Sequence, residues 1–276
     1  MLNKTLWFSL ILGLTSAALA HVAAQPEART MTVEAESPHA TQTCQVTYSS
    51  GTFYTSTQFC VTVNGNIPQF KVRGGQLFPP AGNAADLEGY GFCDVTGGFS
   101  YMDYAAYDND TWNPSTLKQI GNTVTVTRTT ADGNWQLTQT IVNQPASAAS
   151  VGGVKITMKL KNLSSTARAV NLVRFATPDV GGLKNLYNTS QYSASGLFEY
   201  GIGLTLTVNS FLPSFGQEAY VQNIQSGPDP CNPLEFWEMT LPYNGFGSIA
   251  VLWDQAGTAK VAPKGTVTVV STYRGF

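Results

Sequence analysis

The chain has 276 residues and a formal net charge of −2 at pH 7, and only 12% of its residues are charged. This length is sufficient to bury a full hydrophobic core. The basic residues are few and scattered apart from Lys155, Lys159 and Lys161, which excludes nucleic acid as an expected partner. Uncharged hydrogen-bonding side chains supply most of the polar surface, and a surface of this kind favours uncharged ligands.

The N-terminus has the pattern of a secretory signal peptide. Lys4 precedes an apolar run over residues 6–14, and Ala18-Leu19-Ala20 provides the small residues of a cleavage site. An apolar run this short cannot cross a bilayer, which takes roughly 20 residues. We therefore expect residues 1–20 to be removed, and the mature protein to be secreted, either extracellular or periplasmic, without a transmembrane segment.

Residues 21–42 are rich in Ala, Glu, Thr and Pro and show no apolar periodicity. This composition predicts a flexible leader. The remainder, residues 43–276, is expected to form one domain.

From residue 43 onward the main signal is alternation of apolar and polar residues, which predicts half-buried strands. Val124 and Val126 alternate with threonines, and within 154–161 the apolar residues alternate with polar ones that include the three lysines, a pattern typical of a solvent-facing side. Turn-forming residues separate the strands, as at 131–134. Further strands are predicted at 60–64, 70–72, 90–95, 135–141, 170–175, 204–208, 249–253 and 266–273.

No window after the signal shows an apolar stripe at helical spacing. The sequence therefore predicts an all-β fold, a large two-sheet antiparallel β-sandwich. A pair of smaller sandwiches divided near residues 145–150 is the alternative, unless that segment is a long hairpin loop.

The four cysteines are an even number in an exported chain, for which two disulfides are expected. Three pairings are possible. The pairing of Cys44 with Cys60 and of Cys93 with Cys231 is favoured, because residues 49–52 can reverse the chain between the first two.

A hairpin in the middle of the chain resembles a known family. Residues 154–164 and 170–175 are similar to the long strand, Asn-x-Ser turn and second long strand of galactose-mutarotase-like supersandwich domains, and residues 176–180 are similar to a motif of uncharacterised secreted bacterial β proteins. The resemblance implies a supersandwich-like fold. It does not imply epimerase activity, because that chemistry uses histidines and a carboxylate, and no histidine follows His39.

The densest group of aromatic and acidic side chains lies between residues 101 and 113. Flat rings beside carboxylates suit a sugar, whose C–H face stacks while its hydroxyls bind polar groups. The candidate binding residues are Tyr101, Asp103, Tyr104, Tyr107, Asp108, Asp110 and Trp112. Residues 108–110 are also a possible source of oxygen ligands for calcium, without the Gly and distal Glu of an EF-hand. The remaining interpretation is a loop whose tyrosines pack onto a sheet.

Catalytic constellations are sparse. His21 and His39 are the two histidines, and both fall in the predicted leader, so a histidine-based triad or a zinc site is not expected. Paired carboxylates, either from the 101–112 segment, such as Asp103 with Asp108, or from Glu235 and Glu238, are the remaining enzymatic option. Glu235 and Glu238 are the most evident pair, but three positions apart on a strand they face opposite sides, and they can share a site only if the segment turns.

Two expectations concern the interior. The aromatic residues Phe236, Trp237, Trp253 and Trp135 are predicted to lie in the core. Arg174, with Asp179 close behind it, is predicted to be partly buried and paired with a carboxylate that pins the end of its strand.

The sequence thus favours a secreted, non-catalytic β-sandwich that acts by binding or as an envelope component, with carbohydrate as the first candidate ligand. The alternatives are a carbohydrate-active enzyme of the glycoside hydrolase or lyase type that uses paired carboxylates, and a purely structural or adhesive module. No cofactor is expected, calcium is a possible bound ion, and the sequence does not indicate the oligomeric state.

Overall fold

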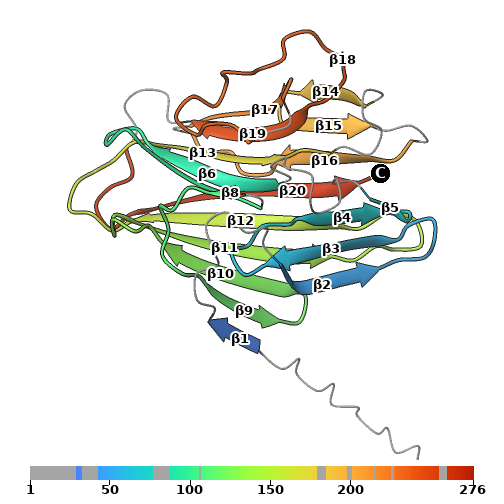
Figure 1. Cartoon of the computed structure of the whole chain (residues 1–276), viewed down its shortest axis with the longest axis horizontal. Helices are drawn as coiled ribbons and strands as arrows, with labels where there is room; N and C mark the ends of the chain where they lie inside the picture. The colour runs from blue at the N-terminus through green and yellow to red at the C-terminus, as the bar shows by residue number, and fades with distance from the viewer. Residues whose placement is uncertain are drawn as a thin grey trace, which may run out of the picture.

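The computed structural model describes residues 29–32, 43–76, 88–105, 107–178, 185–197, 201–213, 215–224, 227–254 and 260–276. The predicted signal peptide lies outside these ranges. The described residues form three antiparallel sheets of ten, six and four strands (Figure 1). Within the same ranges there is no helix of the length and apolarity needed to cross a membrane.

The ten-stranded sheet forms one complete layer. In spatial order its strands are β1 (Arg29–Thr32), β9 (Thr116–Ile120), β10 (Thr123–Thr129), β11 (Trp135–Gln144), β12 (Gly153–Asn162), β20 (Thr266–Gly275), β16 (Gly203–Val208), β15 (Ser193–Leu197), β14 (Leu186–Ser190) and β18 (Tyr243–Asn244). The predicted alternation is confirmed, because the apolar residues of β10 and β12 are buried while the threonines between them are half-buried and Lys155 and Lys159 are exposed. One face of this sheet therefore lies on the core and the other faces solvent.

The predicted all-β antiparallel sandwich is confirmed, and its second layer is divided between the two smaller sheets. The six-stranded sheet has the order β17 (Gly216–Gln222), β19 (Ser248–Asp254), β13 (Val170–Ala176), β6 (Glu88–Asp94), β7 (Phe99–Tyr104) and β8 (Tyr107–Asp108). The four-stranded sheet has the order β2 (Cys44–Ser50), β3 (Thr57–Thr62), β4 (Gln69–Val72) and β5 (Gly75–Gln76).

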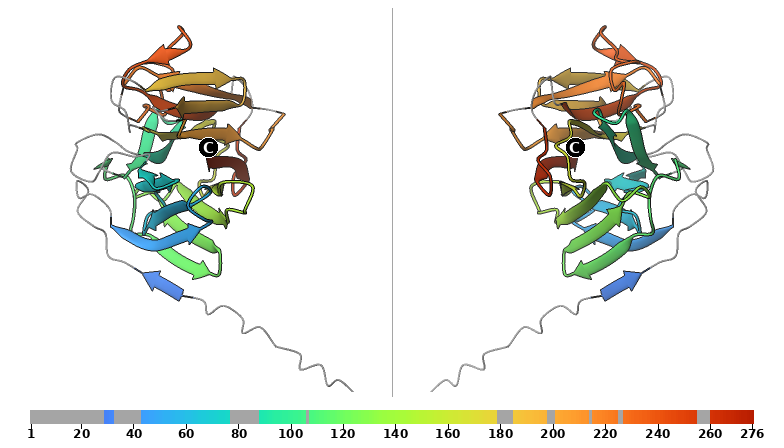
Figure 2. Two further views of the ribbon diagram at one scale, coloured as in Figure 1. Left: turned by 90° about the vertical axis from the view of Figure 1, so that its right-hand side faces the viewer. Right: turned by 90° about the vertical axis from the view of Figure 1, so that its left-hand side faces the viewer.

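The width of the large sheet explains this division. Ten strands spaced about 4.8 Å apart make a face roughly 43 Å wide, whereas six strands span roughly 24 Å. The four-stranded sheet covers part of the remaining inner face, and in Figure 1 β3 and β4 pass in front of β10 to β12. Close contacts join the layers, since a Cβ on Gly275 of β20 would overlap Val72 of β4. Figure 2 shows both small sheets beside the large one in two further views.

Residues 145–152 are a hairpin loop within the ten-stranded sheet. β11 and β12 pair in unbroken register from Trp135 opposite Asn162 to Gln144 opposite Gly153. The segment therefore joins neighbouring strands of one sheet. β1 lies inside the predicted leader and pairs with β9 at the edge of the same sheet, so part of that leader is a strand.

Both disulfides have the favoured pairing. Cys44 of β2 is bonded to Cys60 of β3, and Cys93 of β6 is bonded to Cys231, which lies 138 positions further along the chain. Disulfides of this kind fit a non-cytoplasmic compartment.

Candidate functional site

The predicted sugar-binding residues are mostly in the interior. Tyr101, Asp103, Tyr104 and Trp112 are each less than 10% exposed, which agrees with the interpretation in which the tyrosines pack inward, although residues 99–104 are a strand where a loop was expected. That strand is β7, where alternation sends residues 101 and 103 toward the core and residue 104 to the opposite face of the sheet.

The other members of that group are placed differently. Asp110 is exposed and has a positive φ of 60°. The side chains of Tyr107 and Asp108 lie outside the described residues. Sugar binding by these three residues, and calcium binding at 108–110, therefore stay predictions.

Tyr101 and Trp112 are part of an aromatic cluster. The Tyr101 ring stacks on Phe92 with centroids 4.5 Å apart, and Trp112 meets the same ring edge-on. The Tyr101 hydroxyl donates a hydrogen bond to Asp132 at 2.7 Å. Burial and this carboxylate raise the pKa of Tyr101 well above its ordinary value. The two rings thus stabilise the core.

Asp103 belongs to a buried polar cluster between the layers. Arg128 of β10 forms an ion pair with it, and the Tyr90 hydroxyl donates to the same carboxylate at 3.1 Å. The Asn66 amide also donates to Asp103. The carboxylate is thus surrounded by donors from three separate strands and loops.

A second buried cluster surrounds Arg174. Its guanidinium pairs with Glu88 and donates to Gln139 at 2.8 Å, and Tyr273 donates to Glu88 at 3.0 Å. Burial raises the pKa of Glu88, and the Arg174 charge opposes that rise. Burial lowers the pKa of Arg174 while the Glu88 carboxylate raises it, and the net direction is upward. The sequence prediction of a carboxylate partner is confirmed, but the partner is Glu88, and Asp179 lies outside the described residues.

The connection between β3 and β4, residues 63–68, covers both clusters with main-chain groups. The Asn64 carbonyl accepts hydrogen bonds from Tyr90 at 2.9 Å and from Gln139 at 3.1 Å, and the Ile67 amide donates to Glu88 at 2.6 Å. The Gly65 carbonyl accepts from Arg174 at 3.4 Å. These interior charges therefore meet partners from their own chain.

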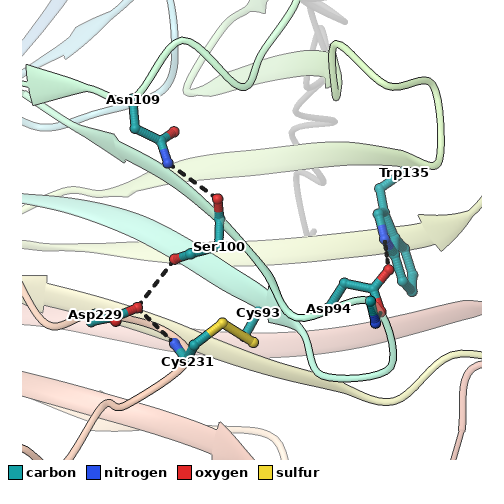
Figure 3. The surroundings of a disulfide bond; sticks show 8 residues. Cys93, Asp94, Ser100, Asn109, Trp135, Asp229 and Cys231 are labelled. Carbon is teal, nitrogen blue, oxygen red and sulfur yellow. Dashed lines mark hydrogen bonds between the residues drawn. A yellow bond between two sulfur atoms is a disulfide. The ribbon is translucent and has the colours of Figure 1, made fainter.

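A long segment covers the outer face of the six-stranded sheet. We call residues 227–247 the stapled segment, because Cys231 in it is bonded to Cys93 (Figure 3). Asp229 accepts hydrogen bonds from Ser100 of β7 at 3.2 Å and from the Cys231 amide at 2.9 Å. Pro230 lies so close to Gly91 that a Cβ there would be 2.6 Å from it. Leu234 packs on an apolar cluster formed by Tyr104, Val173, Phe175, Tyr220, Ala250 and Leu252.

The stapled segment displays large apolar side chains to solvent. Phe236 is 42% exposed, Trp237 is 43% exposed and Met239 is 79% exposed. Their backbone is held in place, since Asn223 donates to the Phe236 carbonyl at 3.2 Å and Glu238 donates to Val221 at 2.8 Å. A partly exposed aromatic surface on a hydrogen-bonded backbone results.

This exposure corrects part of the core prediction. Trp135 and Trp253 are fully buried as expected, whereas Phe236 and Trp237 are not. The signal that distinguishes them is local: residues 228–242 hold four prolines and show no strand alternation, which is typical of a surface loop.

The same segment places the two predicted glutamates. Glu235 donates its amide to the Asn232 carbonyl at 3.2 Å, and Trp237 donates to Leu234 at 3.2 Å, so residues 232–237 turn. The objection that a strand would send Glu235 and Glu238 to opposite faces therefore does not apply. The Glu238 carboxylate accepts a hydrogen bond from the Thr240 amide at 2.7 Å.

No metal-binding cluster was found in the part of the chain that the structure describes, where no three His, Cys, Asp or Glu side chains converge. Asn109 is engaged by the protein, because its Oδ1 accepts from the Met102 amide at 3.2 Å and its Nδ2 donates to the Ser100 carbonyl at 3.1 Å (Figure 3).

Comparison with known proteins identifies an architecture. No protein-family model matches the sequence, and no curated protein matches it. The structure is similar to a bacterial glucoamylase determined with acarbose, with a TM-score of 0.54 and 12% identity over 90% of this chain and 36% of the glucoamylase. It is also similar to a candidate aldose 1-epimerase from Escherichia coli K12, with a TM-score of 0.50 and 11% identity over 84% of this chain and 99% of that one.

The chain is related to these proteins in fold. The sequence resemblance to galactose-mutarotase-like supersandwich domains is thereby confirmed at the level of architecture. This chain spans about a third of the glucoamylase's length. At these identities the likeness extends to the fold alone, and function must be argued from the site.

Proposed function

We propose that the protein is a secreted, non-catalytic carbohydrate-binding protein whose binding surface is the stapled segment around Phe236 and Trp237. The observation that carries this proposal is the exposure of both rings on a segment held by the Cys93–Cys231 disulfide. A rigid aromatic surface binds with little loss of conformational entropy.

The neighbouring polar groups support a sugar ligand. Asn232, Glu235 and Asn244 are exposed in the same segment, and amide and carboxylate groups bind the hydroxyls of a sugar whose C–H face stacks on an aromatic ring. The fold-level similarity to a glucoamylase and to a candidate epimerase is consistent with a carbohydrate ligand.

The interior supports binding without catalysis. Glu88 and Asp103, which are both completely buried, pair with Arg174 and Arg128 and are covered by residues 63–68. A general acid or base must reach its substrate within hydrogen-bond distance, and a completely buried, paired carboxylate does not.

Titration with neutral hexasaccharides of glucose, xylose, mannose and N-acetylglucosamine tests the proposal. We expect wild type to bind at least one of them, and Trp237→Ala to weaken that binding at least tenfold. The matched control is Tyr54→Ala, which removes an exposed ring from the connection between β2 and β3 and is expected to leave binding unchanged. Equal loss in both variants, or no binding by wild type, would contradict the proposal.

A carbohydrate-active enzyme is the second candidate. Residues 232–237 form turns and not a strand, so Glu235 and Glu238 need not point to opposite faces. Incubating the same oligosaccharides with wild type and with Glu235→Gln and Glu238→Gln separates the two. Binding without new reducing ends or unsaturated products supports the first candidate. Product formation that both substitutions abolish supports the second.

A further inference from the structure

The outer face of the ten-stranded sheet is a regular array of hydroxyl groups. Thr125 on β10 lies opposite Thr140 on β11, which lies opposite Thr157 on β12. Threonine and serine also occupy most of the outward positions of β15, β16 and β20, where Leu197 and Val270 are the apolar ones. Eight neighbouring strands of this sheet carry the array: β9, β10, β11, β12, β20, β16, β15 and β14. None of their outward side chains is fully buried.

The charges on this face all have one sign. Its outward residues include five cations, Lys118, Lys155, Lys159, Lys161 and Arg274, and no acidic side chain is found at the outward positions of those eight strands. This asymmetry is unusual in a chain whose net charge is −2.

Most acidic residues in the described ranges lie elsewhere. Glu88, Asp94 and Asp103 are buried and paired with arginines. Glu218, Asp229 and Asp254 belong to the six-stranded sheet and its covering segment, and Asp132 lies in the turn between β10 and β11. The charged side chains at the described outward positions are therefore all positive, although the protein as a whole is slightly negative.

A groove of about 450 Å³ opens on this face where β20 meets β16. Its lining includes the hydroxyls of Thr205, Thr207 and Thr272, the amides of Gln144 and Asn209, and the guanidinium of Arg274. Phe276 contributes an aromatic ring. Thr272 donates to Asn209 at 2.6 Å, which orients two of these polar groups. Lys155 lies on the adjacent strand directly opposite Thr272.

We propose that this face binds an acidic polysaccharide, with an anionic sugar unit in the groove at Arg274 and the chain continuing over Lys155, Lys159 and Lys161. A guanidinium pairs well with a carboxylate or sulfate. The surrounding hydroxyls and amides are suited to sugar hydroxyls, and one aromatic ring at the groove offers a stacking surface.

Features of the face favour this polymer over other anions. The outward residues of the eight strands include no aromatic ring, and single-stranded nucleic acid is bound largely by stacking its bases on such rings. The only exposed large apolar side chain among them is Ile120, which is too little for insertion into a membrane surface. Sheets of many strands are twisted, so a flexible polymer fits better than a flat crystalline surface.

Binding to polygalacturonate and dextran sulfate, with neutral dextran as the uncharged reference, tests the inference. We expect wild type to bind at least one of the two acidic polymers, to bind it more weakly as salt rises, and not to retain dextran. The double variant Lys155→Gln/Arg274→Gln should lose at least tenfold in affinity. The matched control is Lys71→Gln, which removes one cation from β4 of the four-stranded sheet and should bind like wild type.

The inference would be overturned if wild type bound neither acidic polymer, or if wild type and the double variant had equal affinity. Equal retention on dextran, or tighter binding to duplex DNA or to phosphatidylserine vesicles, would also overturn it. Melting temperatures verify that each variant is folded.

The inference is independent of the proposed function. Trp237→Ala should leave acidic polymer binding unchanged, and Lys155→Gln/Arg274→Gln should leave neutral oligosaccharide binding unchanged.

Discussion

Arg174 on β13 and Glu88 on β6 form an ion pair in which neither side chain is accessible to solvent. Removing one member of such a pair leaves an uncompensated buried charge, which typically costs about 3–5 kcal/mol. Arg174→Met should therefore lower the free energy of unfolding by about that amount in a urea titration. The double variant Arg174→Met/Glu88→Leu should recover part of the loss. A single variant within 1 kcal/mol of wild type would refute the role assigned to the pair.

The two disulfides should differ in their contribution to stability. Cys93–Cys231 joins residues 138 positions apart and Cys44–Cys60 joins residues 16 apart. Chain entropy predicts a loss approaching 5 kcal/mol for Cys93→Ser/Cys231→Ser and about 3 kcal/mol for Cys44→Ser/Cys60→Ser. Chemical unfolding of both double variants measures the order. The reverse order would show that loop entropy does not govern these bonds.

Asp132 should make stability depend on pH in the acid range. Burial is the largest single effect and raises its pKa, but hydrogen bonds from the Thr130 and Tyr101 hydroxyls and from Asn134 together outweigh it, so the pKa lies below the ordinary value of 3.8. Its stabilisation is therefore present above that value and lost as pH falls through the lower native pKa. Wild type should be more stable than Asp132→Asn at pH 6, and this difference should disappear on acidification below about pH 4. A difference that stays constant with pH would be inconsistent with an ionised Asp132.

Two tryptophans should respond differently to truncation. Trp253 is fully buried, whereas Trp237 is 43% exposed. Trp253→Ala should cost about 3–5 kcal/mol through the cavity it leaves, and Trp237→Ala about 1 kcal/mol or less. Denaturant titration compares them. Equal losses would mean that the stapled segment packs more tightly than described.

Gly65 tests the covering of the interior by residues 63–68. It has a φ of +88°, and a Cβ there would lie 2.5 Å from Nε2 of Gln139, the residue that also binds Arg174. Gly65→Ala should cost about 1–3 kcal/mol. Gly133→Ala is the matched control, because Gly133 has a φ of +70° but no atom within 4 Å of an added Cβ. The loss at Gly65 should be the larger one.

Local features of the sequence were sufficient to predict many of the strands, but β9, β14, β15 and β17 were not predicted and β1 fell in the predicted leader. Alternation at β10 and β12 marked which side chains face the core, because a strand has a fixed period of two. The hairpin turn at 131–134 and the cysteine pairing also followed from local chemistry. The division of the second layer into two sheets did not, because it depends on how wide a face the strands form together.

The candidate site was harder to predict, because it depends on contacts between residues that are distant in the sequence. The Arg174–Glu88 contact joins residues far apart in the chain, and no local pattern selects Glu88 over Asp179. Residue type alone made Trp237 and Trp253 equivalent, although one lies on a proline-rich loop and the other on a central strand. Likewise, the sequence could not show that Tyr101 and Trp112 are buried, because the same aromatic residue types occur in hydrophobic cores and in ligand-binding sites.

Neutral carbohydrate should bind the stapled segment while the buried clusters around Glu88 and Asp103 stay closed. Hydrogen–deuterium exchange with and without the pooled neutral hexasaccharides measures both regions in one experiment. We expect slower exchange in residues 232–246 and no change in residues 63–67 or 88–92. Slower exchange at 63–67 and 88–92 with no effect on the stapled segment would contradict this expectation.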